Sequence, residues 1–111
     1  MTTDLMAFED IDTAFVPRLR ANVAAIRVDD ETVLFEEDTG GLHQLDAIAT
    51  VVCSLFDGSA PIATIVDELA TAFGADPRVV EVDVLKMTRR LGRHGLLEGV
   101  QGEIREDVVE C

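Results

Sequence analysis

The run LHQLDAIATVVCSLFDG, residues 42–58, changes from a strand pattern to a helix pattern with no loop between the two. Leu42–Leu45 is read as a short strand, and Asp46 can cap a helix because its carboxylate accepts from the amides of the first turn. The apolar residues that follow at helical spacing are Ile48, Val51, Val52 and Leu55. Asp57-Gly58 ends this helix, because glycine readily adopts the left-handed conformation. The run therefore predicts a strand that passes directly into a short helix.

Two further strands are expected before this junction. Residues 22–28 and 32–37 are rich in β-formers, and the acidic residues 29–31 between them indicate a turn. DTGG, residues 38–41, supplies the glycines that a hairpin connection needs. With the strand at 42–45, the first half of the chain predicts a three-stranded antiparallel meander.

The second half is helical. Pro61 lies near the start of a second helix, which Gly74 ends, and Asp76-Pro77 starts a third helix that runs to His94. The apolar stripe of the second helix is Ile62, Ile65, Val66, Leu69, Ala70 and Phe73, and that of the third is Val80, Val84, Met87 and Leu91. Residues 96–100 are expected to form a short final strand or stub. Three strands followed by three helices predict an α+β fold with a winged helix-turn-helix-like layout.

The length of 111 residues indicates one domain. We expect a flexible acidic arm over residues 1–16, the folded domain over 17–100, and a mobile acidic tail over 101–111.

The composition excludes several classes of protein. Asp and Glu number 22 against 9 Lys and Arg, which gives a net charge of −13. Nucleic acids and anionic membrane surfaces attract cationic proteins, so neither is an expected partner. The N-terminus is acidic and has no apolar run, no segment has the length of a membrane span, and the chain has 2 cysteines. These features predict a cytoplasmic protein with a buried free thiol at Cys53.

The sequence offers little catalytic chemistry. Cys53 and His43 are the one pair that contains a strong nucleophile, and they fall on a helix and a strand. Two cysteines and two histidines, scattered along the chain, do not supply the spacing of a zinc site. We therefore predict no catalytic residue, no metal and no cofactor, so that the chain is not an enzyme.

The third predicted helix carries most of the positive charge. Its basic residues are Arg78, Lys86, Arg89, Arg90 and Arg93. They predict either a solvated helix face or a cationic lip for an acidic ligand. Beside the core stripe lies a second stripe formed by Leu85, Thr88 and Gly92. A glycine inside a helix costs about 1 kcal/mol relative to alanine, so Gly92 indicates close approach of another backbone or of a ligand.

The order of these motifs resembles the PqqD family of peptide chaperones. The shared pattern covers residues 18–99 and consists of Leu45-Asp46, Asp57-Gly58, Ile65-Val66 with Leu69, Asp83-Val84, Leu91, and Gly95-Leu96-Leu97. Asp46 stands where the family usually has asparagine, and both residues cap helices well.

The resemblance implies a winged-helix-like recognition element for the leader of a ribosomally made precursor peptide. It also implies presentation of that peptide to a modifying enzyme such as a radical SAM enzyme, a cyclase or a protease. The leader is expected to add as a strand beside the third strand, against the third helix. The residues that we predict to bind the peptide are Leu42, His43, Gln44, Leu45, Leu85, Lys86, Thr88, Arg89, Gly92 and Arg93.

Two other classes stay open at this point. One is a winged-helix regulatory or protein–protein adaptor domain. The other is an assembly subunit that forms a homodimer through its exposed strand edge.

Overall fold

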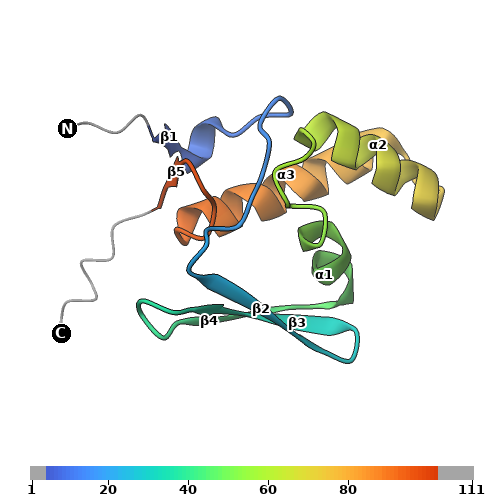
Figure 1. The fold of residues 1–111 in the computed structure, drawn as a ribbon. Helices are drawn as coiled ribbons and strands as arrows, with labels where there is room; N and C mark the ends of the chain where they lie inside the picture. The colour runs from blue at the N-terminus through green and yellow to red at the C-terminus, as the bar shows by residue number, and fades with distance from the viewer. Residues whose placement is uncertain (1–4, 103–111) are drawn as a thin grey trace.

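Three strands form a meander, and the helices pack on one face of it (Figure 1). The structure is a computed structural model and describes residues 5–102. The elements in chain order are β1 (Met6–Ala7), a 3-10 helix η1 (Phe8–Asp10), β2 (Val23–Val28), β3 (Glu31–Glu36), β4 (Leu42–Leu45), α1 (Ala47–Cys53), α2 (Ile62–Phe73), α3 (Pro77–Arg93) and β5 (Val100–Gln101). The sheet order is β2-β3-β4, and both pairings are antiparallel. This confirms the predicted α+β fold, and β4 passes into α1 with only Asp46 between them.

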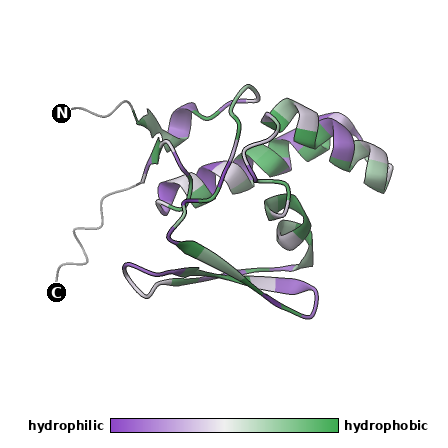
Figure 2. Ribbon diagram, viewed as in Figure 1, coloured by the Kyte–Doolittle hydropathy of each residue, from purple (hydrophilic) through white to green (hydrophobic). Residues whose placement is uncertain are grey.

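The core lies between the sheet and the helices. The sheet contributes alternate residues of β3 and the end of β4, and the helices contribute their apolar stripes. The buried residues of these two layers include Leu34, Leu45, Ile62, Ile65, Leu69, Val84 and Leu91. Figure 2 shows that α1 is hydrophobic along most of its length. Its predicted apolar stripe is nevertheless buried only in part. Ile48 is 64% exposed and Phe73, at the end of α2, is 58% exposed, so both residues add to the surface instead of the core.

The predicted caps hold the helices. The Asp46 carboxylate accepts from the Ala49 amide at 2.8 Å, and the Asp76 carboxylate accepts from the Arg78 amide at 3.0 Å. Gly74 ends α2 with a φ of 63°, as a left-handed C-cap requires. α1 ends at Cys53, earlier than the sequence predicts, and a turn then leads to Gly58, whose φ is 80°.

The N-terminal segment differs from the expected flexible arm. From Leu5 onward it packs on the domain, and the side chain of Ile11 is fully buried in the core. β1 pairs with β5 in parallel, with Met6 opposite Val100. The stub predicted at residues 96–100 therefore ends in a strand, and its partner is the N-terminal segment. The predicted mobile tail lies outside the described residues except for Gln101 and Gly102.

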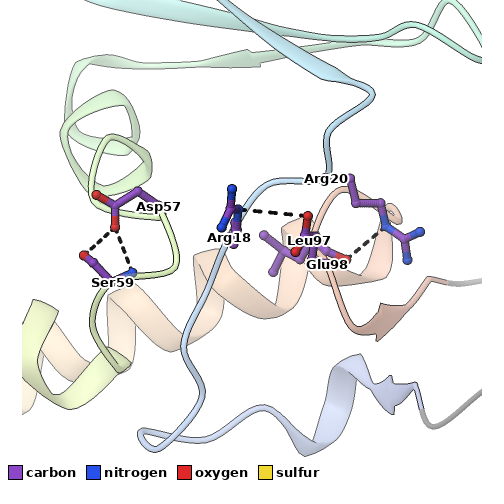
Figure 3. Close-up of polar contacts among 6 residues, drawn as sticks. All are labelled: Arg18, Arg20, Asp57, Ser59, Leu97 and Glu98. Atoms are coloured by element: carbon purple, nitrogen blue, oxygen red, sulfur yellow. Dashed lines mark hydrogen bonds and ion pairs between the residues drawn. The ribbon is translucent and has the colours of Figure 1, made fainter.

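The segment Pro17–Arg20 is hydrogen-bonded to the turn after α1 and to the residues after α3 (Figure 3). The Gly58 amide donates to the Pro17 carbonyl at 3.0 Å on one side, and the Glu98 amide donates to the Arg18 carbonyl at 2.8 Å on the other. Arg20 donates from Nε to the Leu97 carbonyl at 3.0 Å. Beside this segment, hydrogen bonds from Ser59 lower the pKa of Asp57, with a smaller contribution from the charge of Arg18. The Asp57-Gly58 turn therefore holds the segment that leads into β2.

Cys53 is a buried free thiol, as predicted, and burial raises its pKa to about 11. An unfolded thiol ionises near pH 9, so high pH favours the unfolded state until the folded thiol also ionises. The stability from the neutral thiol is complete below about pH 9 and is lost as the pH rises toward 11.

We therefore expect the free energy of unfolding to fall by about 1.4 kcal/mol between pH 8 and pH 10 through this group. Urea denaturation at both pH values measures the fall. All proteins compared carry Cys111→Ser, so that Cys53 is the one thiol that can ionise. Cys53→Ala should be less stable at both pH values but should lack this part of the pH dependence. An equal fall in both proteins would mean that Cys53 does not cause it.

Candidate functional site

β4 is an open edge of the sheet. Among the described residues it pairs with β3 alone, with Leu34 opposite His43 and Thr32 opposite Leu45. Two hydrogen bonds at the C-terminal end of β3 show which backbone groups point outward. The Glu36 amide donates to the Gly41 carbonyl at 2.9 Å, toward β4, whereas the Glu37 amide donates to the Asn22 carbonyl, toward β2.

Successive residues of a strand direct their N–H and C=O groups to alternate sides. The even-numbered residues of β3 therefore bond to β4, so that His43 and Leu45 use their backbone groups inside the sheet. The N–H and C=O groups of Leu42 and Gln44 face outward and have no partner strand in the part of the chain that the structure describes. The structure thus separates the two alternatives, His43 and Gln44, that the sequence leaves open for the outward-facing amide.

α3 runs beside this edge and carries a groove of about 700 Å³, which we call the α3 groove. Its lining residues are Phe8, Asp83, Lys86, Met87, Arg89, Arg90, Arg93 and His94. A second hollow of about 260 Å³, the β4 hollow, is lined by Glu31, Gln44, Leu45, Asp46, Ala49 and Arg90. Arg90 lines both, so the two hollows are neighbours and together connect the β4 edge with α3.

Two histidines form a direct contact between β4 and the C-terminal end of α3. The rings of His43 and His94 lie 5.2 Å apart, centroid to centroid, at an angle of 50°. The Nε2 atom of His43 is also 2.6 Å from a carboxylate oxygen of Glu36. The ring contact places the C-terminal end of α3 close to β4, and the contact with Glu36 links His43 to β3.

Three predicted peptide-binding residues are not accessible, which corrects the prediction for all three. Leu45 is 2% exposed, and its backbone groups face β3. Thr88 is fully buried, and its hydroxyl donates to the Val84 carbonyl at 2.6 Å. Gly92 is buried under the N-terminal segment and β5, and an added Cβ would lie 3.0 Å from the Val100 Cγ1 atom and 3.2 Å from the Phe8 Cβ atom. A glycine is therefore required at position 92 by packing inside the protein, and a ligand does not contact it.

Leu85 also lies away from β4. It lines another hollow, of about 340 Å³, with Val82, Lys86 and Arg89, and the last two of these residues also line the α3 groove. Leu85 and Met87 are two positions apart, so they point to nearly opposite sides of α3. Since Met87 lines the α3 groove and Leu85 does not, a peptide beside β4 would meet Met87.

Other predicted residues do come together. Leu42, His43, Gln44 and Leu45 form the open edge, and Lys86, Arg89 and Arg93 line the α3 groove. Arg89 also binds the N-terminal segment, because its Nε and Nη2 atoms donate to the Ile11 carbonyl at 3.1 and 2.8 Å.

The sequence reasoning missed Phe8, Asp83, Met87, Arg90 and His94. Four of these residues have a common signal, since Asp83, Met87, Arg90 and His94 are spaced by four, three and four positions and share one helix face. Met87 had been counted with the core stripe that it borders. Phe8 had no signal, because it comes from the segment that the sequence assigns to a flexible arm.

The α3 groove is electropositive on an acidic protein. Within residues 5–102, no carboxylate lies within ion-pair distance of Lys86, Arg89 or Arg90. Three cations with no acidic partner among residues 5–102, in a chain of net charge −13, favour an anionic ligand at this surface. The β4 edge adds backbone donors and acceptors, so the site suits an extended peptide.

The described part of the chain shows no group of three or more His, Cys, Asp or Glu side chains that could hold a metal ion. The thiol of Cys53, with a pKa of about 11, is protonated at neutral pH and is therefore a poor nucleophile. Over the same residues, no helix has both the length and the apolar character that crossing a membrane requires.

The fold and the site define a class of protein: a small winged-helix-like domain that keeps one sheet edge open beside a cationic helix. The chain belongs to the PqqD family, since the family model described as coenzyme PQQ synthesis protein D matches residues 31–97. This confirms the family that the motifs resemble.

Relatives and solved structures agree with this assignment. A protein from Xanthomonas oryzae pv. oryzae named PqqA binding protein is 39% identical over 83 residues, which are 73% of this chain and 88% of the relative. TbiB1, solved in complex with the TbiA(beta) leader peptide, has a TM-score of 0.68 and 32% identity over 74% of this chain and 95% of that chain. The PqqD truncation of Methylobacterium extorquens PqqCD, described as a stand-alone RiPP recognition element, has a TM-score of 0.71 and 28% identity over 84% of this chain and 99% of that one.

Proposed function

We propose that this chain binds the leader of a ribosomally synthesised precursor peptide and presents it to a modifying enzyme. The observation that carries the proposal is the open β4 edge, where the backbone groups of Leu42 and Gln44 face outward beside the α3 groove. An extended peptide would pair with these groups as a fourth strand. A relative named PqqA binding protein and a structural neighbour solved with a leader peptide support the same function.

The chain itself carries out no reaction in this proposal. The partner is a modifying enzyme of the radical SAM, cyclase or protease type, and the chain acts in the cytoplasm, where precursor peptides are made. The relatives are named as binding proteins and recognition elements, which supports a role in binding. A homodimer formed through β4 would occupy the same backbone groups, so sedimentation of the free protein at assay concentration distinguishes that arrangement.

The test uses a peptide selected for binding from a displayed library of random sequences, which we call the selected peptide. We expect an extended peptide with apolar anchors and acidic residues, which binds with a dissociation constant on the order of micromolar to tens of nanomolar because ordering a free peptide opposes binding. A selection that yields no binder, or binders that are basic, would contradict the proposal.

Charge reversal in the α3 groove should weaken this binding. Lys86→Glu combined with Arg90→Glu is expected to reduce affinity by about tenfold, since each exposed pair contributes about 0–1 kcal/mol and reversal adds repulsion. Both side chains line the groove, and neither forms a hydrogen bond with another described residue that holds the fold, unlike Arg89. Fluorescence anisotropy measures the affinity.

The matched control is Arg27→Glu combined with Arg78→Glu, which changes the net charge equally but lies outside the α3 groove. The control should bind within about twofold of the wild type, since screened charges at a distance contribute little. Equal losses in both proteins would show a general charge effect, and the groove would then have no specific part in binding.

A further inference from the structure

The N-terminal segment reaches the candidate peptide site. Residues 5–11 lie outside the family match at residues 31–97, yet they cross the C-terminal half of α3 (Figure 1). The Met6 amide donates to the Gly99 carbonyl at 2.9 Å, and the buried side chain of Ile11 anchors the other end. Phe8, between these two anchors, lines the α3 groove.

The fit between this segment and α3 is close. Because Gly92 has no side chain, side chains of the N-terminal segment approach the helix closely. A Cβ added at Gly92 would lie 3.2 Å from the Phe8 Cβ atom and 3.2 Å from the Ile11 Cδ1 atom. Phe8 therefore packs closely on α3 at Gly92, is partly buried against the core, and still lines the groove.

The same segment orients a cation. The Ile11 carbonyl accepts two hydrogen bonds from Arg89, which fixes its guanidinium at the rim of the groove. A guanidinium has five N–H donors, so donors remain after these two bonds. Lys86 and Arg90 line the groove with it, and within the described chain none of the three has a carboxylate at ion-pair distance.

We propose that Phe8, Lys86, Arg89 and Arg90 form a subsite for an acidic side chain of the bound peptide. The carboxylate of an Asp or Glu residue interacts with the three cations, and its methylene groups pack on the Phe8 ring. The ring also shields the ion pairs from water, which strengthens them because the local dielectric falls. This inference rests on the proposed function, and it makes the N-terminal segment a determinant of which peptide is accepted.

The test compares two forms of the selected peptide. Each acidic residue is replaced in turn by its amide, Glu by Gln or Asp by Asn, and the ratio of the two dissociation constants measures discrimination for the charge. For one position, we expect a ratio of about five or more with the wild-type protein. With Phe8→Ala the ratio should fall to about one to two, because the subsite opens to solvent.

Phe73→Ala is the matched control, since Phe73 is exposed at the end of α2 and lies outside the α3 groove. This control should keep the wild-type ratio. Should Phe8→Ala unfold at the assay temperature, Lys86→Gln measures the same subsite at an exposed position, and its ratio should also fall.

The outcomes separate the two proposals. Discrimination that persists in both Phe8→Ala and Lys86→Gln, or a ratio of one at every position with the wild type, overturns the subsite. If the subsite is overturned in this way but Gln44→Pro abolishes peptide binding, the proposed function still stands. Full binding in Gln44→Pro would instead overturn strand addition at β4.

Discussion

Replacing Gln44 by proline is expected to leave the domain folded and to weaken binding of the selected peptide by at least about tenfold, or about 1.4 kcal/mol. The register places the Gln44 N–H on the outer edge of β4, so its loss removes no bond of the sheet. An added strand needs that donor, and the proline ring also obstructs its approach. Circular dichroism checks the fold, and fluorescence anisotropy measures the affinity.

Two variants make this result specific. Gln44→Ala removes the same side chain and its hydrogen bond to Glu31 but keeps the N–H, so it should bind like the wild type. His43→Pro removes an N–H that the register directs to Leu34, and it should weaken or unfold the domain. If both proline variants fold and both bind, the peptide does not use β4.

Ile11→Ala should destabilise the domain by about 2–5 kcal/mol, the usual range for truncating a fully buried isoleucine. For a domain of this size, the melting temperature should then fall by about 8 °C or more, at 4–8 °C per kcal/mol. Thermal denaturation followed by circular dichroism measures this shift.

Val16→Ala is the matched control, because Val16 lies in the same segment and is 44% exposed. It should change the melting temperature by only a few degrees, since surface substitutions usually stay within about 0.5 kcal/mol. A similar small change for Ile11→Ala would show that residues 5–16 behave as a flexible arm.

The elements with strong local signals could be predicted from the sequence. Leu42–Leu45 was placed correctly because glycines precede it and a helix cap follows it. Both proline-associated helix starts were also correct, since Pro61 is the N-cap residue of α2 and Pro77 is the first residue of α3. These signals depend on residues that are close in the sequence.

The remainder depends on contacts between distant residues. Met6 and Ala7 have no strand signal by themselves and pair only because β5 lies beside them. The same contact explains Gly92, whose neighbours Phe8 and Val100 lie far from it in the sequence. The site was predicted only in part for this reason. The open edge and the cations follow from local patterns, whereas the buried state of Gly92 depends on the distant residues that pack on it.

The parallel pairing of β1 with β5 brings the two ends of the described chain to one corner of the domain (Figure 1). Because Met6 lies opposite Val100, a linker attached before Leu5 and a linker attached after Gly102 start within a few residues of each other. Linkers of equal length would hold a fused enzyme at a similar distance from the α3 groove, whichever end carried the fusion. The order of the two genes in such a fusion would therefore have little effect on the local concentration of bound peptide at the enzyme.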